Sequence, residues 1–227
     1  MSESGCDPGY IIKKLKQTYK VEPSEFLALE VWYKTRDPFK VLIATILTQN
    51  TTDKGAKRAY EELEREVGVT PDKLSSAEID KIKNCIKSIG LYNNKAKIIK
   101  TVSTLIMEQY GGDLENLLDL DQIESRQRLV ELPGIGKKTA DVVMLTCKGY
   151  RVFPVDTHIL RVSERLGIKG GYDKVSEFWK ESLGSDLLEA HLILITHGRK
   201  TCKAINPKCN SCSINDCCRY YAGLRRS

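Results

Sequence analysis

Apolar residues recur at helical intervals along most of the chain. The segments with helical apolar spacing or helix-forming composition are separated by Gly, Pro, Asp or Ser, and they cover residues 39–48, 57–67, 78–89, 94–109, 123–131, 137–148, 157–166 and 186–197. In the clearest segment, 137–148, the apolar side chains follow an i, i+3, i+4, i+7 pattern: Ala140, Val143, Met144 and Cys147. No alternating run is long enough for a strand, so the pattern predicts an all-α protein.

Composition narrows the class of protein. With 41% hydrophobic and 29% charged residues, the chain fits a globular protein. No apolar run approaches the ~18 residues that a membrane span requires, and the N-terminus lacks the apolar stretch of a signal peptide. We therefore expect an intracellular protein, cytoplasmic or at the nucleoid, that has no membrane partner and acts as a monomer. The formal net charge of +6 is compatible with a polyanionic partner, although many unrelated proteins share it.

Cysteines concentrate near the C-terminus, where five of the eight lie between Cys202 and Cys218. Disulfides are disfavoured in a reducing compartment, so clustered cysteines there favour metal ligands. We predict plain thiols at the scattered positions Cys6, Cys85 and Cys147. The ligand-like set has the spacing Cys-x6-Cys-x2-Cys-x5-Cys: Cys202, Cys209, Cys212 and Cys218.

A metal centre would explain how the cysteine loop, residues 202–218, is ordered. A loop of this length cannot bury much apolar surface, whereas four thiolates on zinc or on an iron–sulfur cube would hold it. Structural zinc usually recruits two Cys-x2-Cys pairs and this loop has one, which favours iron without excluding zinc. Cys217 competes with Cys218 for the fourth ligand position, and the x5 spacing favours Cys218.

Residues 132–136 read Leu-Pro-Gly-Ile-Gly and lie between two predicted helices. The proline and the glycines permit a tight turn whose backbone N–H groups face outward at the start of the next helix, which makes an anion site. Phosphates of a DNA duplex are the anions that we expect, with contacts from this set: Leu132, Gly134, Gly136 and Lys137. The alternative is an ordinary connection between helices with surface lysines.

Distinctive stretches follow one another along the chain: FKVLIATILTQNTTD (39–53), IKSIGLYNNKAKIIK (86–100), LPGIGKKTAD (132–141), PVDTH around Asp156, and HGRKTC at the start of the cysteine loop. Together they resemble endonuclease III, the bifunctional branch of the helix-hairpin-helix DNA glycosylase superfamily, over roughly residues 25–220. The resemblance implies two helical lobes. Residues 40–150 would form a helical barrel with the hairpin, and residues 1–39 plus 151–227 a lobe whose cysteines hold a 4Fe–4S cluster.

The same resemblance implies a base-excision-repair enzyme that removes damaged pyrimidines, oxidised ones in particular, from duplex DNA and cuts 3′ to the abasic site by β-elimination. Lys138 matches the family's nucleophile, whose amine attacks the sugar C1′ and forms a Schiff base. Asp156 matches the essential aspartate, which accepts a proton or stabilises the cationic sugar. Considered alone, Lys138 could be a solvated helix lysine and Asp156 a helix N-cap worth about 1 kcal/mol.

Flipping a base out of the duplex leaves a gap that inserted side chains fill. Leu91 resembles the family's wedge into the base stack. The family's gap-filling glutamine falls at Asn50, beside Gln49, so that either residue could fill the gap. Lys203 and Lys208 belong to a predicted basic ridge for phosphates. The implied partner is double-stranded DNA that contains a damaged base or an abasic site.

Two other functions remain open on the sequence. A mismatch thymine or uracil DNA glycosylase of the same superfamily would lack the lysine at position 138. A non-enzymatic DNA-binding module would use the hairpin alone, which leaves the pairing of Lys138 with Asp156 unexplained. The three histidines, His158, His191 and His197, we interpret as packing or hydrogen-bonding residues.

Overall fold

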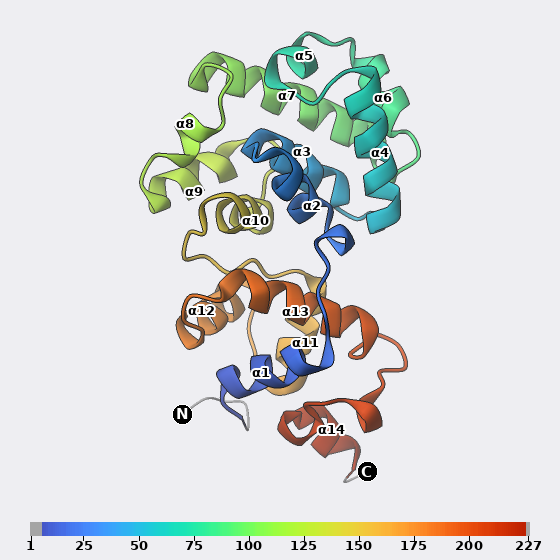
Figure 1. Ribbon diagram of the computed structural model, residues 1–227, viewed down its shortest axis with the longest axis vertical. Helices are drawn as coiled ribbons and strands as arrows, with labels where there is room; N and C mark the ends of the chain where they lie inside the picture. Colours follow the sequence, from blue (N-terminus) through green and yellow to red (C-terminus); the bar gives the residue numbers. More distant parts are fainter. Residues whose placement is uncertain (1–5, 226–227) are drawn as a thin grey trace. The chain divides into compact units, whose positions relative to one another are not determined.

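The computed structural model describes residues 6–225, and in that part of the chain the regular elements are helices, without a strand (Figure 1). The predicted all-α fold class is confirmed. Internal contacts divide the chain into two units. The hairpin unit is Glu22–Tyr150, and the cysteine unit contains the residues up to Val21 together with those from Arg151 onward. None of the helices in the described range combines the length and the hydrophobicity that a bilayer span needs.

The hairpin unit is built around α3 (Pro38–Thr48), which is buried on nearly every side. A helix that is apolar all round must lie in a core, and α3 packs against α2, α4, α7 and α10. The bounds of the other helices in this unit are η1 (Pro23–Glu25), α2 (Leu27–Thr35), α4 (Asp53–Glu66), α5 (Pro71–Ser76), α6 (Ile79–Ile86), α7 (Tyr92–Tyr110), α8 (Glu115–Leu118), α9 (Gln122–Glu131) and α10 (Lys137–Lys148).

This unit begins earlier than the sequence predicted. We expected the boundary at residue 40, with residues 1–39 in the other lobe, but the division falls between Val21 and Glu22. The reason is α2, which packs on α3 and α10. Its buried Glu30 also forms an ion pair of 2.7 Å with Lys57 of α4. Residues 22–39 therefore belong with 40–150.

The cysteine unit is built around α13 (Leu187–Lys200), which packs against α1 (Pro8–Thr18) and α11 (Thr157–Leu166). Trp179 of α12 (Tyr172–Ser182) is fully buried, and its indole Nε1 donates a hydrogen bond of 2.9 Å to Ser163 Oγ of α11. The chain then continues through the cysteine loop, which holds η2 (Cys209–Ser211) and η3 (Asn215–Cys217), to α14 (Arg219–Leu224).

Strongly periodic segments were located most accurately. α10 and α11 begin and end where the apolar pattern predicted, and α11 is terminated by Gly167, whose φ of 99° suits glycine. The predicted segments did not include α1, α2, α5, α8, α12 and α14. α12 buries only Val175 and Trp179 along its length, which is too thin a pattern to predict a helix.

Candidate nucleic-acid interface and catalytic residues

The hairpin of residues 132–136 connects α9 to α10. Gly134 has a φ of +75°, and a Cβ at this position would clash with the side chain of Ile98 on α7. Both the backbone conformation and the close packing therefore require glycine here. Gly136 is different, because its φ of −90° suits any residue and nothing lies within 4 Å of where a Cβ would be. Its lack of a side chain leaves the start of α10 open.

The N-terminus of α10 is a candidate anion site. Gly136 is the N-cap residue and provides no side-chain cap for the first amides of the helix. Lys137, which is exposed, and Lys138, which is half-buried, form the first turn. The side chain of Leu132, a predicted DNA contact, is buried at 5% exposure. The backbone N–H of Leu132 donates a hydrogen bond of 3.2 Å to the carbonyl oxygen of Leu129.

Asp156 lies in the cysteine unit as the N-cap of α11. Its Oδ1 accepts a hydrogen bond of 2.8 Å from the backbone N–H of Ile159, as the capping interpretation of the sequence predicted. The residue is half-buried and follows a buried stretch, residues 152–155. The carboxylate is consequently held in one orientation while part of it stays accessible.

The two predicted insertion loops lie side by side in the hairpin unit. Leu91 is 61% exposed in a left-handed conformation with a φ of 59°, directly before α7. Asn50 is also exposed and left-handed, with a φ of 49°. A Cβ on Gly90 would lie 3.7 Å from the carbonyl oxygen of Asn50, so the two loops lie close together.

Gln49 and Asn50, which the sequence could not separate, have different environments. The side-chain Nε2 of Gln49 donates to Thr139 Oγ1 at 3.2 Å and to the carbonyl oxygen of Gly134 at 3.4 Å. Gln49 therefore ties its loop to the hairpin and to α10, whereas Asn50 presents its side chain to solvent.

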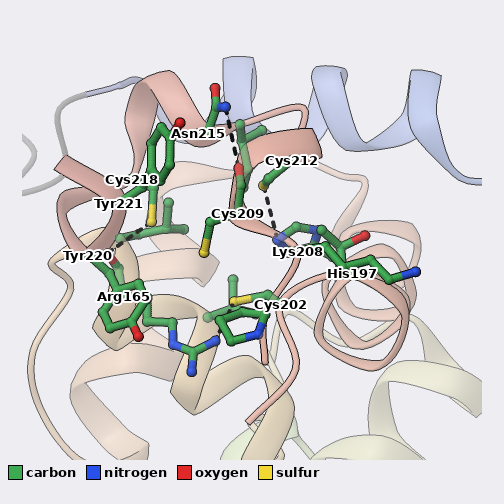
Figure 2. Close-up of a pocket in the computed structure, with 15 residues that line it drawn as sticks. Arg165, His197, Cys202, Lys208, Cys209, Cys212, Asn215, Cys218, Tyr220 and Tyr221 are labelled. Atoms are coloured by element: carbon green, nitrogen blue, oxygen red, sulfur yellow. Dashed lines mark hydrogen bonds between the residues drawn. The ribbon is translucent and has the colours of Figure 1, made fainter. Parts of the chain in front are cut away.

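The four candidate ligands line one pocket in the cysteine unit: Cys202, Cys209, Cys212 and Cys218. Their sulfur atoms are directed into the pocket from the loop and its flanks (Figure 2). None of the four is in a disulfide. Burial, together with the smaller effect of the charges on the other three cysteines, raises the pKa of Cys212 to about 11. Within residues 6–225, no three His, Cys, Asp or Glu side chains are grouped closely enough to hold a single metal ion.

One cysteine prediction is wrong. Cys6, expected to be a plain thiol, forms a disulfide with Cys217, and their Cα atoms are 5.3 Å apart. Packing of α1 brings them together, and Tyr10 of that helix donates a hydrogen bond of 3.1 Å to Asp216 beside Cys217. The disulfide removes Cys217 as a competitor for the fourth ligand position and leaves Cys218. The free thiols expected at Cys85 and Cys147 are present.

Two arginines of α11, which the sequence analysis missed, hold the start of the cysteine loop. Arg161 donates from Nε to the carbonyl oxygen of Cys202 at 3.0 Å. Arg165 donates to Cys202 Sγ at 3.3 Å and to the carbonyl oxygen of Lys203 at 2.7 Å. Their four-residue spacing places both on one face of α11 and was the available signal. The predicted basic residues Lys203 and Lys208 are both exposed on this loop.

The histidines have the structural environments that we predicted. His158 Nδ1 lies 3.0 Å from Arg161 Nη2, and His191 Nδ1 lies 3.0 Å from the carbonyl oxygen of Pro154. His197 is buried, with its Nδ1 3.0 Å from the hydroxyl of Tyr19. Burial lowers the pKa of His197 to about 4.

Comparison with known proteins identifies the family to which this chain is similar. Residues 43–183 match the family of HhH-GPD superfamily base excision DNA repair proteins. Endonuclease III of Sulfolobus acidocaldarius is 45% identical over 213 residues, which cover 92% of this chain and 93% of that protein.

Two solved structures are similar over nearly the whole chain. A non-covalent endonuclease III–DNA complex aligns with a TM-score of 0.81 at 29% identity, covering 96% of this chain and 97% of that one. A trapped endonuclease III–DNA covalent intermediate aligns with a TM-score of 0.78 at 28% identity, covering 97% and 100%. Fold and site thus define a helix-hairpin-helix protein of base excision DNA repair. The chain belongs to the endonuclease III family, and the predicted class of enzyme, a DNA glycosylase and abasic-site lyase, is confirmed.

Proposed function

We propose that this enzyme removes oxidised pyrimidines from double-stranded DNA and cuts the strand 3′ to the abasic site through a Schiff base on Lys138. The observation that carries the proposal is the position of Lys138 in the first turn of α10, directly after the hairpin. The positive end of the helix dipole disfavours the ammonium form there, and only a neutral amine is a nucleophile. The trapped covalent intermediate of a similar endonuclease III supports covalent chemistry.

In the proposed reaction, the Lys138 amine attacks the sugar C1′ as the bond from C1′ to the base breaks, and the base leaves with the electron pair. Asp156 accepts a proton from the amine or stabilises the positive charge that develops on the sugar. The sugar ring then opens as the C1′–O4′ bond breaks and O4′ takes a proton, and the imine formed between C1′ and the lysine nitrogen makes the C2′ proton acidic. Loss of this proton expels the 3′ phosphate and cuts the strand.

DNA binding is proposed to rest on both units. The open amides of α10 at Gly136 and the ammonium group of Lys137 would bind backbone phosphates without reading sequence. The exposed Lys203 and Lys208 would add phosphate contacts on the cysteine loop. Leu91 would enter the stack as the wedge. Asn50 would fill the gap, because Gln49 is already hydrogen-bonded to the hairpin.

The cysteine pocket fits a 4Fe–4S cluster held by the four free thiols that line it: Cys202, Cys209, Cys212 and Cys218. A cationic centre between buried thiols that oppose one another's ionisation would stabilise them as thiolates. When bound, the cluster would brace the loop. Iron and sulfide analysis tests this assignment, and purified protein with about one zinc and no iron would contradict it.

Borohydride trapping tests the mechanism. Borohydride reduces an imine to a stable amine, so that the enzyme and an abasic strand become cross-linked. Lys138→Ala should abolish both the cross-link and β-elimination. The matched control Lys137→Ala removes the same charge from the neighbouring exposed position, and it should weaken binding while leaving trapping intact. Asp156→Asn should keep DNA binding and lose turnover by about 10²–10³-fold. An undiminished cross-link in Lys138→Ala would reject the mechanism.

A further inference from the structure

Lys95 of α7 is a buried lysine with a specific set of acceptors. It lies within the family-like stretch 86–100, and the proposed mechanism gives it no role. It is 2% exposed. Its Nζ donates a hydrogen bond of 3.0 Å to the carbonyl oxygen of Leu47, near the end of α3, and one of 2.7 Å to Thr51 Oγ1. Burying an ammonium group costs free energy unless it is well hydrogen-bonded, so its position calls for a reason.

The contacts of Lys95 lead directly to the first insertion loop, residues 49–52. The Thr51 hydroxyl that accepts from Lys95 donates in turn to the carbonyl oxygen of Gln49 at 3.1 Å. Gln49 is itself anchored to the hairpin through Gly134 and Thr139. The left-handed backbone of Asn50 is therefore fixed by Lys95 through Thr51 on one side and by the hairpin on the other.

The second insertion loop, residues 90–91, belongs to the same helix as Lys95. Leu91 precedes α7 and lies four residues before Lys95, and Ile98, which backs Gly134 of the hairpin, lies three residues after it. Lys95 and Ile98, at i and i+3, share one face of α7, and Leu91 is the N-cap residue of the same helix. α7 consequently supports three loops: the wedge, the gap-filling loop and the hairpin.

We propose that Lys95 is a positioning residue, which holds Asn50 beside Leu91 so that both can enter the duplex when a base is flipped. The proposal rests on the proposed function, because it assigns Lys95 to the base-flipping step of that reaction. Lys95 itself does not touch the reacting sugar. Burial of Lys95 lowers its pKa to about 8, in agreement with a dry site under the two loops.

The test compares Lys95→Met with Lys97→Met. Both changes remove one ammonium group from α7, but Lys97 is exposed. The probe is a duplex with a tetrahydrofuran abasic analogue opposite 2-aminopurine, whose fluorescence changes when side chains enter the gap. Wild type and Lys97→Met should give this change. Lys95→Met should lose most of it and still bind undamaged duplex as well as Lys97→Met does.

A second readout separates positioning from chemistry. Cutting at an abasic site in a single strand requires no gap to be filled. Lys95→Met should therefore lower the single-turnover rate on duplex about tenfold or more, because small displacements of positioned groups are costly. Its rate on single-stranded abasic DNA should stay within about twofold of wild type, a difference at the limit of measurement. Equal losses on both substrates would overturn the proposal.

Thr51 provides an independent variant in case Lys95→Met fails to fold. Thr51→Val removes the hydroxyl that links Lys95 to Gln49, and it should reproduce the loss of rate on duplex DNA. Thr51→Ser keeps a hydroxyl and should keep the wild-type rate on duplex DNA. An unchanged 2-aminopurine response in Thr51→Val would also overturn the proposal. Failure of the proposed function looks different, because wild-type enzyme would then form no borohydride cross-link with abasic DNA of either kind.

Discussion

The hairpin and the cysteine loop are both proposed to contact DNA, yet they are held in place by different means. The hairpin of residues 132–136 rests on apolar packing, with Gly134 against Ile98 and with Leu132 and Ile135 buried. The cysteine loop, residues 202–218, buries little beyond Ile214 and Cys217. Polar and covalent links replace packing there: arginine hydrogen bonds from α11, the disulfide from Cys6, and four thiols around one pocket.

This difference shows that two ordered surface segments can be held in place although one buries much more apolar surface than the other. A short turn between two helices inherits its order from them, since its few residues pack against elements that fold without it. A longer loop at the edge of a unit has no such support and needs cross-links to offset the loss of conformational entropy. The comparison predicts that removing a cross-link damages the cysteine loop alone, whereas enlarging Gly134 damages the fold of the hairpin unit.

The largest expected effect is the loss of the ordered structure of the cysteine loop in Cys212→Ser. Without one of the four proposed ligands, the cluster should not assemble and residues 202–218 should become sensitive to protease, because little apolar packing remains to hold them. The hairpin unit should stay protected. Iron content and limited proteolysis with mass mapping measure both parts. Protease resistance of the loop in iron-free protein would show that the cluster is not its main support.

The next effect is expected from Gly134→Ala, which should lower the free energy of unfolding by about 2 to 4 kcal/mol. A left-handed non-glycine residue costs about 1 to 2 kcal/mol, and displacement of Ile98 adds a similar amount. Denaturant titration of the hairpin unit measures the change.

Gly136→Ser is the matched control at the same hairpin. It has no internal clash, and the serine side chain can cap α10, so that stability should be kept or slightly raised. The cap would occupy the amides proposed to bind phosphate, and affinity for both damaged and undamaged duplex should fall. Equal stability losses in the two variants would contradict the distinction between the glycines.

A smaller effect is expected from Cys6→Ser, which removes the disulfide to Cys217. The variant should lose about 2 kcal/mol of stability, since its unfolded chain is no longer cross-linked. Iron content should stay unchanged, because the four proposed ligands remain. Thermal denaturation of wild type with and without reductant provides the comparison, and Cys85→Ala, which removes a free thiol, is the control. Loss of iron in Cys6→Ser would mean that Cys217 replaces a ligand once it is released.

The same contrast explains which features could be predicted from sequence. The bounds of α10 and α11, the cap at Asp156 and the turn at Gly134 depend on residues a few positions apart, and local spacing carries that information. The disulfide joins residues 211 positions apart. The hydrogen bond from Lys95 to Leu47 spans 48 positions, and the one from Gln49 to Gly134 of the hairpin spans 85. Nothing in the local pattern around these residues marks their partners, which only the packing of α1, α3, α7 and α10 brings together.

Lys95 is a buried charged residue of the hairpin unit, and it predicts a dependence of stability on pH. Burial lowers the pKa of Lys95 from 10.5 to about 8 in the folded protein. Between these values the unfolded chain binds more protons than the folded one, so the stability of wild type should rise with pH in this window, as the cost of burying a charge is relieved. Below pH 8 the full cost applies. The gain should be about 1 to 3 kcal/mol by pH 10. Lys95→Met lacks the group, so subtracting its stability from that of wild type at each pH isolates Lys95 from every other titrating residue. A difference between the two proteins that stays constant from pH 7.5 to 10 would show that Lys95 keeps an ordinary pKa, and that the site beneath the insertion loops is wetter than its burial implies.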